Sequence, residues 1–129
     1  MAESGALAQV ARSTWVHVLF AFVAMGAWAA FANRMHGSVA MWFAFVVQGG
    51  LSAILTLFLK RWLEGAFAHL SGLWARLVPP AVSCLIIGAA LVLAHRAAGT
   101  PEVLATIALP WTVSTLYAFV YTATLRREG

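Results

Sequence analysis

Four long stretches without a formal charge interrupt this chain, and they constrain its fold more than any other feature. Each stretch lies between two charged residues: Arg12 and Arg34, Arg34 and Lys60, Arg76 and Arg96, or Glu102 and Arg126. The stretches contain 21, 25, 19 and 23 residues, respectively. Because a helix of about 20 apolar residues crosses the hydrocarbon core of a bilayer, each stretch is long enough to span a membrane.

The residues inside these stretches favour helices over strands. Apolar side chains recur on every face, as in residues 21–32, without the alternation of a membrane strand. We therefore predict an all-α membrane protein with four transmembrane helices, over residues 13–32, 38–59, 77–94 and 102–125. The composition agrees, since 63% of the residues are hydrophobic and only 9% are charged. Residues 1–129 are expected to form a single four-helix transmembrane domain.

Short connections predict that the spans pair as two tandem helical hairpins. Residues 33–37 join the first two spans, and residues 95–99 join the last two. Ser38 is expected to cap the second span. Thr100, Pro101 and Glu102 have the order expected of an N-cap, a first-turn proline and a carboxylate at the positive end of a helix.

The middle connection, from Lys60 to Arg76, is longer and has a different pattern. Apolar residues recur in it at helical spacing between residues 62 and 74, whereas Glu64, His69 and Ser71 lie on the other side. This pattern predicts an amphipathic helix that lies in the membrane surface. The alternative is a loop with aromatic anchors.

The two halves of the chain resemble each other at a shift of 62 residues. This shift aligns Arg34 with Arg96, Gly37 with Gly99, and residues 26–27 with residues 88–89. It predicts a parallel internal repeat with halves at about residues 5–64 and 65–129, each crossing the membrane twice. The alternative is coincidence between two apolar hairpins that use few residue types.

Lysine and arginine are distributed unequally between the two sides of the predicted membrane. One side carries six: Arg12, Lys60, Arg61, Arg76, Arg126 and Arg127. The other side carries two, Arg34 and Arg96. Since cytoplasmic loops are enriched in these residues, we expect a multi-pass protein of the bacterial inner membrane with both termini in the cytoplasm.

Several classes of function lack the residues that they require. The chain contains no aspartate, and none of its four glutamates lies in the interior of a predicted span. Cys84 is the only cysteine, and no Cys/His cluster has the spacing of metal ligands. We therefore expect no enzymatic activity, no cofactor and no metal site. The positive charge is explained by the membrane topology, so a nucleic-acid partner is not expected.

The two hairpin turns form a candidate site for an anionic headgroup. Its arginines could contact a phosphate, and the starts of two helices would supply backbone N–H groups. The residues of this site are Arg34, Arg96, Ser38, Thr100, Asn33, His36 and His95. The alternative is that each arginine complements the C-terminal dipole of its own helix and extends to the lipid headgroups.

Polar residues also follow one face of the second span and one face of the fourth. They are Gln48, Ser52, Thr56, Ser114, Tyr117 and Tyr121. Polar side chains in a membrane usually face protein or a cavity, so these could line an intramembrane polar groove. The alternative is contact between helices, aided by Gly49 and Gly50. Either arrangement favours a homo-oligomer or a complex with another membrane protein.

The layout resembles that of the GtrA-like small four-span membrane proteins. These are of similar length and basic, and Lys60-Arg61-Trp62 after the second span is similar to their basic-aromatic end. The resemblance implies a protein that binds membrane lipids and translocates or presents a lipid or a polyprenyl-phosphate-linked sugar for cell-envelope synthesis. The alternative function is that of a non-catalytic accessory subunit in a larger membrane complex.

The predicted topology can be tested by labelling single cysteines in a variant that lacks Cys84. Cysteine at position 35 or 98, in place of Met35 or Ala98, should react with a membrane-impermeant maleimide added outside the cytoplasmic membrane. Cysteine in place of Ala8 or Glu128 should react only after the membrane is opened. Labelling of the last two positions from outside would reverse the orientation.

Overall fold

The computed structural model describes residues 2–127, and this part of the chain is helical with no strand. Its elements are α1 (Ala2–Ala32), the short 3-10 helix η1 (Arg34–His36), α2 (Ser38–His69), α3 (Gly72–Ala98) and α4 (Val103–Thr124). Each α-helix contains a segment that is long and apolar enough to cross a membrane. The predicted all-α, multi-pass class is therefore confirmed.

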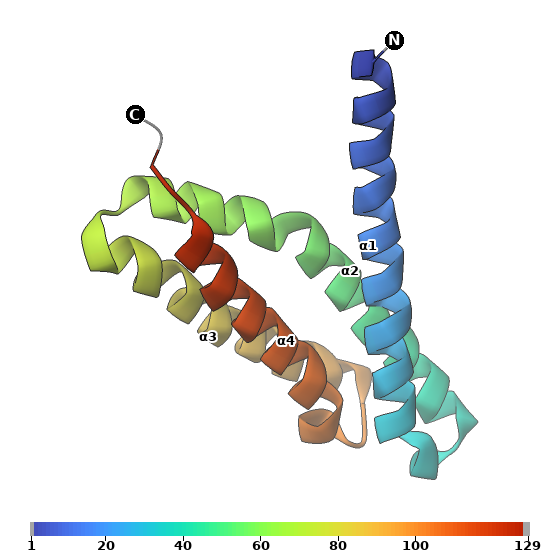
Figure 1. Cartoon of the computed structure of the whole chain (residues 1–129). Helices are drawn as coiled ribbons and strands as arrows, with labels where there is room; N and C mark the ends of the chain where they lie inside the picture. The colour runs from blue at the N-terminus through green and yellow to red at the C-terminus, as the bar shows by residue number, and fades with distance from the viewer. Residues whose placement is uncertain (1, 128–129) are drawn as a thin grey trace.

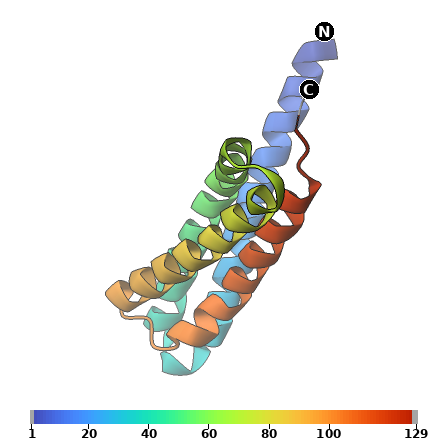
Figure 2. The same cartoon turned by 90° about the vertical axis from the view of Figure 1, so that its left-hand side faces the viewer.

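Helix α2 occupies the centre of the arrangement. It packs against α1, α3 and α4, and α3 packs along α4. Figure 1 shows that η1 and the α3–α4 connection lie at one end, which we call the turn end. The start of α1 and the end of α4 point toward the opposite end, which we call the terminal end; Figure 2 shows the same arrangement from the side.

The connection between α2 and α3 differs from the predicted surface helix. Residues 60–69 continue α2, and residues 72–76 begin α3, so only Leu70 and Ser71 separate the two helices. Leu63 and Phe67 are buried there, because the C-terminal part of α2 bends across the neighbouring helices (Figure 1). The separate surface helix was therefore a wrong prediction, since its residues belong to α2 and α3. Leu63 and Phe67 pack against protein, whereas Trp62, Leu73 and Trp74 remain exposed.

Both predicted helix caps at the turn end are also wrong. Ser38 is the first residue of α2, and Gly37 precedes it with φ 93°, a left-handed conformation that suits glycine. Helix α4 begins at Val103 after Glu102, so Thr100 lies too early to cap it. Instead, the Thr100 N–H donates to the carbonyl of His95 and closes the end of α3.

Two glycines allow α1 and α2 to cross at close range. A Cβ atom on Gly26 would lie 2.9 Å from the carbonyl oxygen of Phe45, and one on Gly49 would lie 2.8 Å from that of Phe22. The rings of Phe22 and Phe45 pack edge to face, with centroids 5.8 Å apart. Small residues at such a crossing let the backbones approach and form the van der Waals contacts that hold membrane helices together.

This crossing predicts that alanine destabilises the protein at position 49 but not at the adjacent position 50. Gly49→Ala should lower the free energy of unfolding by about 1–3 kcal/mol, because the new methyl group would collide with the Phe22 backbone. Gly50→Ala is the matched control, since no atom lies within 4 Å of its added Cβ. Unfolding in mixed micelles, followed by circular dichroism, measures both. Equal stability of the two variants would contradict the crossing.

Candidate functional site

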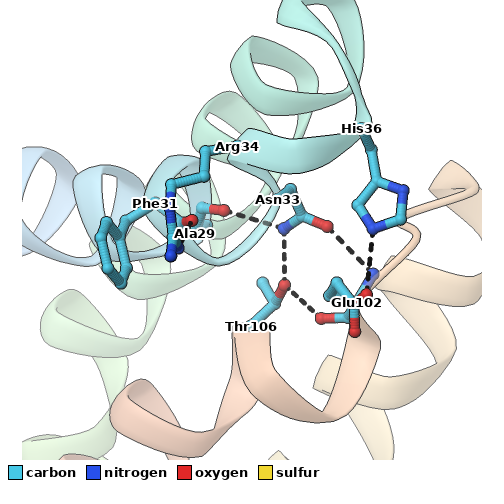
Figure 3. Close-up of polar contacts among 7 residues, drawn as sticks. All are labelled: Ala29, Phe31, Asn33, Arg34, His36, Glu102 and Thr106. Atoms are coloured by element: carbon cyan, nitrogen blue, oxygen red, sulfur yellow. Dashed lines mark hydrogen bonds and ion pairs between the residues drawn. The ribbon is translucent and has the colours of Figure 1, made fainter.

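Asn33 connects the end of α1 to the start of α4 (Figure 3). Its Nδ2 donates to the carbonyl of Ala29 at 2.8 Å and to Oγ1 of Thr106 at 2.7 Å. Its Oδ1 accepts from the backbone N–H of Glu102 at 3.0 Å, across 69 residues of sequence. Asn33 is fully buried, so these bonds replace the water that its amide loses. A residue of the first hairpin turn thus forms hydrogen bonds with the first turn of α4.

His36 and Arg34 lie at the surface of the same end. His36 Nε2 lies 2.9 Å from Oε1 of Glu102, and both side chains are exposed. Arg34 Nη1 donates to the carbonyl of Phe31 at 2.8 Å, and the guanidinium lies 3.9 Å from the centre of the Phe31 ring. Arg34 therefore contacts the C-terminal turn of α1, the helix before it, as expected for an arginine that complements the helix dipole. The binding of an anionic headgroup at the two hairpin turns stays a prediction.

His95 is the centre of a second, buried polar network. Its Nδ1 lies 2.8 Å from Oγ1 of Thr100, and its Nε2 lies 2.8 Å from Oε1 of Gln48. Gln48 Nε2 then donates to Oγ of Ser52 at 2.9 Å. His95 and Gln48 are fully buried. The sequence analysis assigned these residues to two different sites, whereas the structure joins them in one chain from the turn end into the middle of α2.

A cleft of about 820 Å³ opens between α1, α2 and α4 toward the terminal end. Helices α1 and α4 are joined near the turn end, where Trp28 Nε1 donates to the carbonyl of Ala105 at 2.9 Å. They diverge from there toward the termini (Figure 1). The cleft is therefore closed by the contacts at the turn end and opens where α1 leaves the other helices.

Four of the six residues predicted to form a polar groove line this cleft: Ser52, Thr56, Ser114 and Tyr117. The other two do not belong to its lining. Gln48 is buried beside His95, and the hydroxyl of Tyr121 donates to Oε1 of Glu64 at 2.5 Å. The Tyr121 contact joins the C-terminal part of α2 to α4, and its ring stacks on that of Tyr117, with centroids 5.4 Å apart.

The sequence analysis missed the contribution of α1 and of the basic residues. Phe20 and Met25 of α1 form an apolar wall, and His17 lies nearer the terminal end. Lys60 and Arg61 of α2 complete the lining at that end. The sequence showed Lys60-Arg61 as a basic motif. Nothing in the sequence of α1 could have predicted that this helix lines the cleft, because its position depends on the angle at which it crosses α2.

The described side chains offer no group of three or more His, Cys, Asp or Glu that could hold a metal ion. A polar interior, an apolar wall and a basic end are the chemical features of the cleft. A scan against protein-family models and searches of curated proteins and of solved structures find no match to this chain.

Proposed function

We propose that this chain binds an anionic membrane lipid in the cleft between α1, α2 and α4. It would do so in a bacterial inner membrane, to translocate or present a lipid or a polyprenyl-phosphate-linked sugar for cell-envelope synthesis. The observation that carries the proposal is the cleft itself, which lies among three membrane-spanning helices and has two basic residues at one end.

The walls of the cleft suit an amphiphile. Phe20, Met25 and Phe58 offer apolar surface to a hydrocarbon chain, whereas Ser52 and Tyr117 offer hydroxyl groups to a polar one. The volume of about 820 Å³ falls within the range of about 300–1,000 Å³ that is common for small-molecule sites. Part of the ligand would remain in the surrounding bilayer, since the cleft is open on one side.

The charge at the terminal end favours an anionic headgroup. Lys60 and Arg61 line this end, and an arginine guanidinium can bind two phosphate oxygens at once. By the distribution of lysine and arginine, this end faces the cytoplasm. We therefore propose that the headgroup is held near the cytoplasmic interface and that the chain of the lipid runs between the helices.

The parallel repeat is part of the same proposal. Helix α1 packs along α2, and α3 packs along α4, which supports a chain of two tandem hairpins. The second hairpin is closed by the contacts of Gly88 with Trp111, whereas the first opens toward the cleft. We also propose that the chain associates with a second copy or with another membrane protein.

The proposal predicts that headgroup charge determines binding. Purified protein in neutral detergent should bind dioctanoyl phosphatidylglycerol about tenfold more tightly than dioctanoyl phosphatidylcholine, because both lipids carry a phosphate but only phosphatidylcholine also carries a quaternary ammonium, which Lys60 and Arg61 repel. The double variant Lys60→Gln/Arg61→Gln should lose this preference. Titration calorimetry measures both affinities.

The matched control removes two positive charges from the turn end. Arg34→Gln/Arg96→Gln should retain the preference for phosphatidylglycerol if the headgroup lies at Lys60 and Arg61. Loss of the preference in this control alone would place the headgroup at the hairpin turns. Equal binding of the two lipids by the unsubstituted protein would contradict the proposal and favour the accessory-subunit function.

A further inference from the structure

The His95 network joins two cavities at opposite sides of the helix bundle. Thr100 lines a smaller cavity of about 360 Å³ at the turn end, between η1, α2 and the α3–α4 connection. Ser52 lines the cleft. His95 and Gln48 connect these two residues through consecutive hydrogen bonds of 2.8–2.9 Å. A buried titratable side chain thus lies between a cavity on one side and the proposed lipid site on the other.

The partners of His95 are compatible with both its neutral and its protonated form. A neutral imidazole donates from one nitrogen and accepts at the other, whereas an imidazolium donates from both. Both atoms that face the ring are oxygens, Oγ1 of Thr100 and Oε1 of Gln48. The Thr100 hydroxyl can donate or accept, so it serves either form. His95 can therefore gain a proton without the loss of a hydrogen bond.

We propose that His95 is a proton-binding site whose occupancy is coupled to the cleft. The proton enters from the cavity at the turn end, beside Thr100. The structure places Gln48 with Oε1 toward the ring and Nε2 toward Ser52, the orientation that protonated His95 requires because both of its ring nitrogens donate. The Ser52 hydroxyl, which accepts from Gln48, then turns its own hydrogen toward the cleft. When His95 is neutral with its proton on Nδ1, the Gln48 amide can turn over, and the Ser52 hydroxyl donates to it instead.

The surroundings of His95 supply no counter-ion that would hold the proton permanently. Among the described residues, its hydrogen-bond partners from α2 and from the α3–α4 connection are the neutral Gln48 and Thr100. The charged and titratable groups of the turn end make other contacts than with His95. His36 and Glu102 pair with each other, and Arg34 contacts Phe31. Arg96 is exposed. An anionic headgroup at Lys60 and Arg61 would offset their positive charge, so its binding favours the proton on His95 through the low-dielectric interior, and the coupling is reciprocal.

This inference rests on the proposed lipid site, and the chain offers a direct way to test it. Only four histidines are present, and His17 lines the cleft, so His36→Gln/His69→Gln leaves two imidazoles, and the addition of His95→Gln identifies the resonances of His95 by their loss. In protein labelled with ¹⁵N-histidine, the ring nitrogen resonances of His95 should move in one transition as the pH is lowered. At a fixed pH within this transition, dioctanoyl phosphatidylglycerol should move them further toward the imidazolium positions. The headgroup is a phosphodiester, so its own charge does not change.

The same two-substitution protein should bind this lipid about fivefold more tightly at the acidic end of the titration than at the basic end. The addition of His95→Gln should remove that difference, and circular dichroism checks that this variant remains folded. Ring resonances that do not change with pH, or that respond to pH identically with and without lipid, would overturn the inference. Absence of lipid binding at every pH would refute the proposed function, and the titration without lipid would still decide whether His95 binds a proton.

Discussion

The requirement that polar groups inside a membrane find partners within the protein determines the arrangement of the turn end. No water is present in the hydrocarbon core to compensate an unpaired amide or imidazole. Asn33, Gln48 and His95 are fully buried, and no buried side-chain nitrogen or oxygen atom of the described residues lacks a partner. Asn33 therefore fixes the end of α1 to the start of α4, and the bond of His95 with Gln48 fixes α3 to α2 at this end.

At the terminal end, α1 lies apart from α4, and the cleft results from this difference between the two ends. The close crossing at Gly26 and Gly49 sets the angle between α1 and α2, and the contact of Trp28 with Ala105 holds α1 to α4 only near the turns. Beyond these contacts α1 diverges from α4, so apolar and hydroxyl side chains are left facing a cavity instead of another helix. A bundle whose helices are held together by hydrogen bonds at one end and separated at the other can receive a lipid from the bilayer.

Much of this fold could be predicted from the sequence, because span length and hydropathy are properties of single segments. The polar residues of the cleft, such as Ser52 and Ser114, were found by their spacing along one helix face. The pairing of Asn33 with Glu102 and of His95 with Gln48 could not be predicted, since each bond joins helices whose relative angle depends on packing. The continuation of α2 to His69 was missed for a related reason: Leu63 and Phe67 look the same in sequence whether they face lipid or protein.

The central claim is that the cleft holds an anionic lipid, and photo-crosslinking in native membranes tests it most directly. p-Benzoylphenylalanine at position 20 would replace Phe20 on the wall of the cleft, and the same residue at position 85 would replace Leu85, which is 72% exposed on α3 and does not line the cleft. Mass spectrometry of the lipid adducts should find anionic lipids enriched at position 20 and the bulk membrane composition at position 85. The same lipid composition at both positions would contradict the account.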